Sequence, residues 1–168
     1  MYNELIDQLP YKSSFLFVDN ISLLNKDEVV GDYTLRKDAF FYEDHFVGHP
    51  VTPGVIITEI MAQIGLVVLG IYLINQAAGG NSNKVAGGTA VKASTGFAVG
   101  EGEALFPLLT STDVFFYKMV LPGEKVTVAS RKQYFRFGKL KCAVEMRNGA
   151  GELVAKGVFA GFIKKLPI

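Results

Sequence analysis

Two side chains that can exchange protons, His45 and Glu59, lie fourteen positions apart in one stretch that ends at Gln63. An imidazole titrates near physiological pH, and carboxyl groups are common proton donors, so a loop histidine followed by a sheltered acid suits general acid–base chemistry. Glu59 stands inside an apolar run, where a carboxylate is costly unless it is paired, hydrogen-bonded or neutral. Glu59 is therefore a candidate proton donor.

A helix must carry this acid. Thr52 is a good N-cap and Pro53 suits the first helical position, where its missing N–H costs nothing. The run from Val55 to Ile74 is apolar almost throughout, which predicts a helix buried on both faces. About 20 apolar residues can also cross a membrane. Glu59 and Gln63, one turn apart on one face, argue against a span.

Length and composition describe one globular domain over residues 1–168, with 49% hydrophobic residues and a formal net charge of +1. Met1 to Pro10 contain no basic segment leading into an apolar one, so we expect no secretory signal and a cytoplasmic protein. The one cysteine, Cys142, agrees with a reducing compartment and is expected to be a buried strand residue. No metal-ligand spacing or phosphate-binding loop is present in the sequence.

The rest of the chain predicts a sheet around the helix. After a short helix over Asn3–Leu9, alternation and turn residues indicate strands on either side of the long helix. The glycine-rich connection over residues 78–103 predicts a loop or mobile insertion with room for a short strand. One long helix and an antiparallel meander make an α+β fold, with the sheet curling around the helix. The predicted strands are Phe15–Leu24, Glu28–Arg36, Ala104–Met119, Lys125–Phe137, Lys139–Arg147 and Glu152–Ile163.

Charge is distributed unevenly along the chain. Residues 117–168 hold 11 Lys or Arg against 3 Asp or Glu. Such a basic segment could steer an acidic partner, although ordinary solvated strand faces explain it equally well. Nucleic acid is not expected, because no recognition helix or RNA-binding motif accompanies the charge. The candidate patch consists of Arg131, Lys132, Arg136, Lys139, Lys141, Lys164 and Lys165.

Several linked motifs occur in order from residue 9 to about residue 163. They are Leu9-Pro10-Tyr11-Lys12, Phe15 to Asp19, Phe40-Phe41, His45-Phe46-x-Gly48-x-Pro50, Pro53-Gly54-Val55, Glu59-x-Met61-Ala62-Gln63 and Pro122-Gly123-Glu124. Together these motifs resemble the bacterial 3-hydroxyacyl-[acyl carrier protein] dehydratases of hot-dog fold. The chain departs from the family pattern at Val47, where proline is common, at Tyr11, where histidine is frequent, and in the longer 78–103 connection.

The resemblance implies a residue-by-residue role for the site. His45 would be the base that removes a proton next to the thioester carbonyl, and Glu59 the acid that protonates the departing hydroxyl. Gly54, with Val55, would supply backbone N–H groups to the thioester oxygen at the helix start. Gln63 would hydrogen-bond within the site or anchor the carboxyl. Glu rather than Asp at position 59 favours dehydration without isomerisation.

The resemblance also implies partners. The substrate would arrive on the phosphopantetheine arm of acyl carrier protein, with no metal or other cofactor. The protein would be a homodimer, with His45 and Glu59 of each site coming from opposite subunits, and dimers could assemble further, for example as a trimer of dimers. An acyl tunnel could be lined by aromatic side chains, namely Phe115, Phe116, Phe135 and Phe137.

Two other functions remain open from the sequence. A hot-dog acyl thioesterase also uses a carboxylate near a helix, but it needs an attacking water and gains nothing from His45. A non-catalytic acyl-binding or scaffold subunit is suggested by Val47 and the unusual 78–103 segment. The type of product, enoyl thioester or free thiol, separates the enzymatic alternatives.

Overall fold

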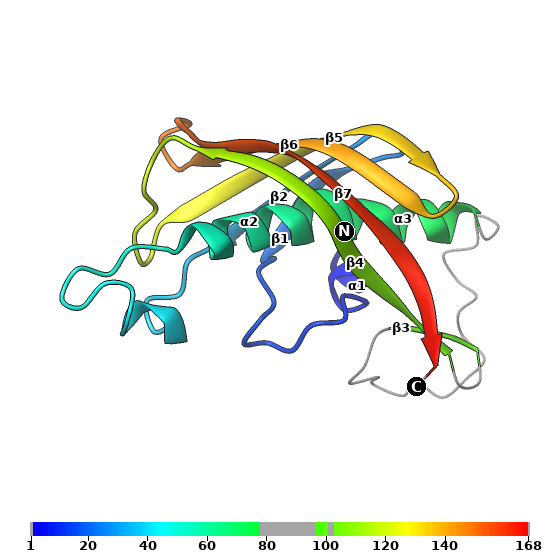
Figure 1. The fold of residues 1–168 in the computed structure, drawn as a ribbon, viewed down its shortest axis with the longest axis horizontal. Helices are drawn as coiled ribbons and strands as arrows, with labels where there is room; N and C mark the ends of the chain where they lie inside the picture. The colour runs from blue at the N-terminus through cyan, green and yellow to red at the C-terminus, as the bar shows by residue number, and fades with distance from the viewer. Residues whose placement is uncertain (1, 78–96, 101–102, 168) are drawn as a thin grey trace.

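The strands form one antiparallel sheet that arches over a long helix (Figure 1). The computed structural model describes residues 2–77, 97–100 and 103–167. Across the sheet the strand order is β1-β2-β5-β6-β7-β4-β3. The strands are β1 (Asn20–Leu24), β2 (Glu28–Thr34), β3 (Phe97–Gly100), β4 (Glu103–Phe116), β5 (Lys125–Arg136), β6 (Lys139–Asn148) and β7 (Leu153–Pro167).

Alternating side chains set the inner face of the sheet. In β5, Val126, Val128 and Ser130 are buried while their neighbours are exposed, and β6 buries every second residue from Leu140 to Met146. This period of two places one row of each strand against the helix and the other in solvent. Cys142 belongs to the buried row, as the sequence predicts.

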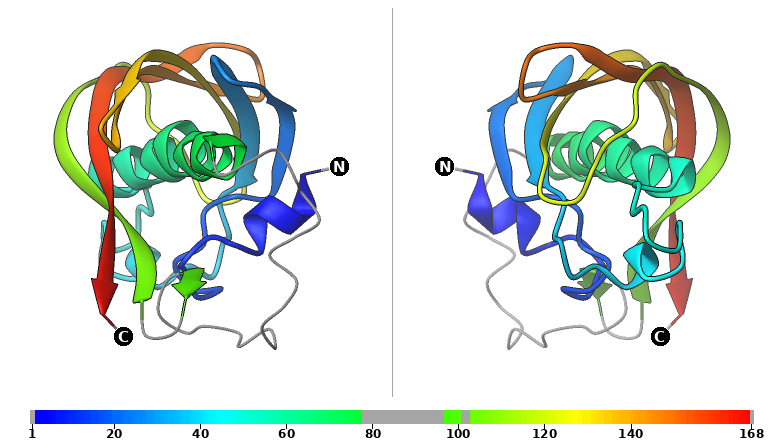
Figure 2. Two further views of the ribbon diagram at one scale, coloured as in Figure 1. Left: turned by 90° about the vertical axis from the view of Figure 1, so that its right-hand side faces the viewer. Right: turned by 90° about the vertical axis from the view of Figure 1, so that its left-hand side faces the viewer.

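The central helix runs without a break from Gly54 to Ala77. It consists of α2 (Gly54–Ala62), a π-helical segment η2 (Gln63–Val68) and α3 (Leu69–Ala77). Figure 2 shows the strands curving around this helix on one side, with the short helix α1 (Asn3–Ile6) on the side that the sheet leaves open. The helix is long and apolar enough to cross a membrane by composition, but 78% of its apolar window is buried inside the protein. It is the core helix.

The helix start differs from the sequence prediction. Pro53 occupies the N-cap position without a side-chain cap bond, and α2 begins at Gly54. The Thr52 hydroxyl instead lies 2.6 Å from the Tyr42 hydroxyl. The first turn is also not buried on both faces, because 76% of Val55 is exposed. The predicted capping role of Thr52 was wrong, because its hydroxyl forms a hydrogen bond with Tyr42 and not with the helix start.

The strand predictions agree with the structure except at the first strand and near several ends. Residues 15–19 precede β1 and are not in a strand. The Phe17 N–H donates to the Gln63 side chain at 2.8 Å, so it has no strand partner. Most of the predicted 78–103 loop lies outside the described residues; within it, β3 pairs with the start of β4.

Candidate functional site

His45 lies in the loop between the 3-10 helix η1 (Phe40–Tyr42) and α2. Its Nδ1 is 2.9 Å from the carbonyl oxygen of Val51. A carbonyl only accepts hydrogen bonds, so Nδ1 carries the proton and Nε2 holds the free lone pair. The ring is half-buried and stacks on Phe46, with 4.0 Å between ring centroids. The imidazole is thereby prepared to accept a proton at Nε2.

Backbone hydrogen bonds hold this loop at both ends. The His45 N–H donates to Phe41 O at 3.1 Å, and the Val51 N–H donates to His45 O at 2.9 Å. The Thr52 N–H donates to Val120 O at 2.9 Å, which ties the loop to the connection between β4 and β5. His45 therefore sits on a fixed loop beside the start of α2.

Glu59 lies on α2 and is half-buried. Its Oε1 accepts a hydrogen bond from Gln63 Nε2 at 2.8 Å. The Gln63 side chain is fully buried; its Nε2 also donates to Phe15 O at 2.9 Å, and its Oε1 accepts from Phe17 N at 2.8 Å. The amide therefore holds one carboxylate oxygen and ties the N-terminal segment to the helix.

Glu59 faces an apolar cavity of about 230 Å³ between the helix and the sheet. Its polar side chains are those of Glu59 and Tyr11. His45 is absent from the lining among the residues that the structure describes. The cavity is lined by Tyr11, Glu59, Ala62, Leu66, Val67, Gly70, Pro107, Leu108, Leu109, Leu140, Gly161, Phe162 and Ile163.

Gly54 and Val55 form the exposed first turn of α2. Backbone N–H groups in a first helical turn have no intrahelical acceptor and carry the positive end of the helix dipole. A Cβ at position 54 would lie 3.3 Å from the Phe116 ring, so glycine lets this ring pack close to the helix start. This turn can therefore bind a developing negative charge.

Tyr11 was noted in the sequence only as a departure from the family pattern, but the structure places it at the cavity wall with Glu59. The pKa of the Tyr11 phenol is raised mainly by burial and, to a smaller extent, by the nearby Glu59 carboxylate. The hydroxyl therefore remains a hydrogen-bond donor at neutral pH. No local pattern predicts that Tyr11 and Glu59 share a cavity, since they lie 48 positions apart in the sequence. The available signal was the place of Tyr11 within the N-terminal motif.

The aromatic residues expected to line a tunnel do not line this cavity. Phe137 is fully exposed at the tip between β5 and β6, and Phe115 lies on the outer face of the sheet. Residues 107–109 of β4 and 161–163 of β7 form its sheet wall instead, with Phe162 as the one phenylalanine among the described lining residues. Phe116 lies at the helix start, where a Cβ on Gly54 would be 3.3 Å from its ring, and Phe135 packs against the core. The four aromatics therefore do not form one common wall.

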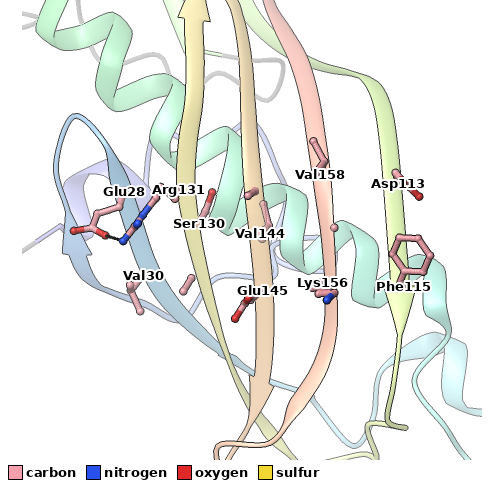
Figure 3. Close-up of a pocket in the computed structure, with 13 residues that line it drawn as sticks. Glu28, Val30, Asp113, Phe115, Ser130, Arg131, Val144, Glu145, Lys156 and Val158 are labelled. Carbon is pink, nitrogen blue, oxygen red and sulfur yellow. Dashed lines mark ion pairs between the residues drawn. The ribbon is translucent and has the colours of Figure 1, made fainter.

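A second hollow, of about 560 Å³, lies on the outer face of the sheet (Figure 3). Figure 3 shows Glu28 beside Arg131 at one side, where a carboxylate oxygen and a guanidinium nitrogen are 3.8 Å apart. Charges of both signs line it, and neither His45 nor Glu59 is among its lining residues in the described part of the chain. Despite its larger volume, this hollow is separate from the acid–base residues.

Several known proteins match this sequence. Residues 9–95 match the FabA-like domain family. The 3-hydroxyacyl-[acyl-carrier-protein] dehydratase FabZ of Syntrophotalea carbinolica is 34% identical over 140 residues, covering 79% of this chain and 92% of the relative. The protein of the same name from Geobacter metallireducens is 41% identical over 64 residues, covering 38% of this chain and 43% of the relative. The Syntrophomonas wolfei FabZ protein is 44% identical over 63 residues, with 37% and 44% covered. This chain thus spans less than half of the length of the last two relatives.

Solved structures share the fold at low sequence identity. The dehydratase heterocomplex ApeI:P from Xenorhabdus doucetiae has a TM-score of 0.67 at 13% identity, covering 95% of this chain and 90% of that one. A hypothetical thioesterase with coenzyme A from Streptococcus pneumoniae has a TM-score of 0.58 at 12% identity, with 100% of both chains covered. Together with the curled sheet, the central helix and the sequence matches, these likenesses show that the chain has the hot-dog fold and belongs to the FabA-like family of the bacterial 3-hydroxyacyl-[acyl-carrier-protein] dehydratases.

Proposed function

We propose that the protein dehydrates a 3-hydroxyacyl thioester carried on acyl carrier protein to the trans-2-enoyl thioester, in fatty acid synthesis or a related polyene or polyketide route. The observation that carries the proposal is a glutamate anchored by Gln63 and facing an apolar cavity. The FabZ relative matched over 92% of its length has this activity in its name. No cofactor takes part in the proposed reaction, and the cytoplasm is the expected compartment.

The chemistry needs one base, one acid and donors for the thioester oxygen. Nε2 of His45 takes the proton from C2, and the electron pair of the C2–H bond forms the C2=C3 double bond. The C3–O bond breaks as Glu59 delivers a proton, so the hydroxyl leaves as water. Negative charge that develops on the thioester oxygen is stabilised by the amides of Gly54 and Val55. The proton on His45 then returns through solvent to Glu59.

A homodimer would complete this site. Within one chain the cavity beside Glu59 is not lined by His45 among the described residues. In the described part of the chain, β4 has no partner strand along residues 106–116 on the edge opposite β7. Exposed apolar side chains gather here and at the helix start: Val55, Leu108, Leu109, Phe115 and Phe116. Pairing of two β4 edges about a two-fold axis would cover them and bring His45 of one copy to Glu59 of the other.

Acyl carrier protein is the proposed substrate carrier, and the basic strand ends are its proposed docking surface. Arg131 and Lys132 form ion pairs with Glu28 and Asp27 and are partly neutralised. Register pairs Arg136 with Lys139 and Lys139 with Phe162 at one end of the sheet. Arg136 and Lys139, together with Lys141 and Lys164, offer a positive surface to an acidic carrier protein.

The test is mass spectrometry of 3-hydroxyacyl carrier proteins incubated with the protein. The parent should produce a species lighter by one water, and His45→Ala and Glu59→Gln should each slow its formation about 10²–10⁴-fold. His49→Ala and Glu43→Gln, on exposed side chains of the same loop, serve as matched controls that retain activity. Release of free thiol would support a thioesterase, and binding of acyl carrier protein without turnover would support an acyl-binding subunit; either result overturns the proposal.

A further inference from the structure

Tyr11 supplies the second polar side chain in the described wall of the cavity beside Glu59, and the proposed proton transfers do not use it. The other described lining residues are all apolar. A hydroxyl in apolar surroundings is costly unless it finds a hydrogen-bond partner. A ligand that enters the cavity can supply this partner.

The segment that carries Tyr11 is fixed against the central helix. The Phe15 N–H donates to Lys12 O at 2.8 Å, which closes a turn directly after Tyr11. The Tyr11 and Phe15 rings meet at this turn, with centroids 6.0 Å apart and planes tilted by 53°. Gln63 Nε2 donates both to Phe15 O at 2.9 Å and to Glu59 Oε1 at 2.8 Å. One amide therefore holds the Glu59 carboxylate and the turn that positions Tyr11.

The Tyr11 hydroxyl is available to a ligand. Within the described residues it forms no hydrogen bond, yet no buried side-chain oxygen or nitrogen among them lacks a partner. The hydroxyl is therefore not sealed inside the core and can be reached from the cavity that its side chain lines. Burial, and to a smaller extent Glu59, raises the pKa of the phenol, so the hydroxyl is a hydrogen-bond donor at neutral pH.

The substrate class of the proposed reaction offers one matching group. Beyond its thioester, a 3-hydroxyacyl chain carries a single polar atom, the oxygen on C3. This oxygen has two lone pairs, so it can accept a hydrogen bond from Tyr11 with one and the proton from Glu59 with the other. Negative charge builds on it as the C3–O bond breaks, which strengthens the hydrogen bond from Tyr11. Tyr11 keeps its own proton throughout.

From this arrangement we propose that the Tyr11 hydroxyl binds the 3-hydroxyl group of the substrate, so that the site prefers 3-hydroxyacyl thioesters to acyl thioesters without this group. The inference rests on the proposed dehydratase function, which places the C3 oxygen beside Glu59. A site that hydrogen-bonds a substrate hydroxyl discriminates against the analogue that lacks it.

Tyr11→Phe removes only the hydroxyl and tests the assignment. Calorimetry compares 3-hydroxyhexanoyl pantetheine with hexanoyl pantetheine in a His45→Ala background, which prevents turnover and keeps Glu59. Adding Tyr11→Phe should weaken binding of the hydroxyacyl ligand about 2- to 10-fold, because one hydrogen bond is lost. Binding of the saturated ligand should not weaken. With His45 intact, kcat/KM for 3-hydroxyhexanoyl pantetheine should fall by at least about 2-fold.

Tyr72→Phe is the matched control. Tyr72 lies on α3 and packs against the core, and it is not among the described residues that line the cavity. This variant should leave both affinities and kcat/KM unchanged. The circular dichroism spectrum and Tm of Tyr11→Phe should equal those of the parent, because the ring and its contact with Phe15 remain.

Equal weakening of both ligands would assign Tyr11 a structural role, and an unchanged affinity for the hydroxyacyl ligand would exclude the hydrogen bond; either result overturns the proposal. Failure of the proposed function gives a different pattern. A parent without turnover whose preference for the hydroxyacyl ligand is lost in Tyr11→Phe keeps the Tyr11 site without the reaction. A parent that dehydrates its substrate while Tyr11→Phe changes neither kcat/KM nor affinity keeps the reaction and loses the Tyr11 site. Where neither ligand binds, kcat/KM decides, and an inactive parent then overturns both.

Discussion

The amide of Gln63 makes three hydrogen bonds, one to the Glu59 carboxylate and two to the backbone of Phe15 and Phe17. Gln63→Leu should leave the buried Phe17 N–H without an acceptor, which costs about 1–3 kcal/mol of unfolding free energy. It should also lower kcat, since Glu59 loses its anchor. Denaturant unfolding and steady-state kinetics measure the two effects. Gln76→Leu, on an exposed position of α3, is the control; equal behaviour of both variants would contradict the anchoring role.

Cys142 provides a prediction about pH. Burial raises the pKa of the Cys142 thiol from 9.0 to about 11. Below pH 9 the thiol is neutral in both the folded and the unfolded chain, so it adds no pH dependence. Between pH 9 and 11 only the unfolded thiol ionises, so the free energy of unfolding should fall as pH rises, by no more than about 3 kcal/mol.

The comparison is with Cys142→Ala, which keeps all other titrating groups. The difference between the two unfolding free energies should change through that window and stay constant below it. The folded thiol should also react slowly with iodoacetamide at pH 8, because little thiolate is present. A pH-independent difference or fast labelling would show that the thiol is not sheltered.

Among the residues, His45 and Glu59 are predicted as acid–base groups because they belong to one short stretch with a recognisable helix start, and these roles remain predictions. The hydrogen-bond partners of these two side chains were harder to predict from the sequence. The Val51 carbonyl that sets the His45 tautomer is a backbone atom without a sequence signature. Contact of Tyr11 with the Glu59 cavity depends on how the N-terminal segment crosses the helix.

Among the elements, the π-helical segment η2 is an unpredicted feature of the central helix. The Ser130 hydroxyl of β5 donates to Gly65 O within η2 at 2.7 Å, and both groups are buried. A Cβ on Gly65 would lie 2.9 Å from Val144 Cγ1, so the segment packs directly on the sheet. Widened helical turns leave carbonyls poorly paired, and a side-chain donor compensates for this.

Ser130→Ala should therefore destabilise the protein by about 1–2 kcal/mol, because it leaves a buried carbonyl without its donor. A lowering of Tm by about 2–8 °C in thermal unfolding measures the effect. Ser22→Ala removes an exposed hydroxyl from β1 and should have little effect. Equal Tm values for the two variants would argue against a supporting role for Ser130.

Elements were predictable where local patterns determine them. Strands β5, β6 and β7 follow one another through short turns, and their alternation is visible in the sequence. The segment over residues 15–19 was assigned to a strand because it is apolar and aromatic. In the structure a side chain from a helix 46 positions away takes the Phe17 N–H, an arrangement that strand propensity does not describe.

For the whole molecule, the proposed dimer predicts complementation between inactive variants. If each site combines His45 of one chain with Glu59 of the other, a mixed dimer of His45→Ala and Glu59→Gln chains contains one intact site. The purified mixed dimer should then have about half of the parent activity, because one of its two sites is intact. Co-expression with two different affinity tags, followed by the enoyl assay on the doubly purified dimer, measures it.

Each variant purified alone is the control and should remain inactive. Absence of recovery in a verified mixed dimer would place both groups of a site in one chain. A parent that stays monomeric at assay concentrations while turning over substrate would exclude the shared site. Val55→Glu, on the exposed helix start, should shift the parent toward monomer in size-exclusion chromatography.

The fold class followed from the order of elements, since one apolar helix before an antiparallel meander has few ways to bury its surface. The order of the strands in the sheet could not be predicted in this way. Pairing of β2 with β5 and of β4 with β7 joins segments separated by the helix or by two strands. Such long-range pairing depends on the curvature of the whole sheet around the helix.

The Gln63 amide also has a consequence for thermal behaviour. It fastens the first part of the chain to the residue proposed as proton donor, although that part contributes only one short helix and no strand before Asn20. Segments with few packed elements open before the rest of a domain on warming. Fraying at the amino end would remove two of the three hydrogen bonds that orient the Gln63 amide beside Glu59 while the sheet is intact. Dehydratase activity should therefore be lost on heating at a lower temperature than the fold melts.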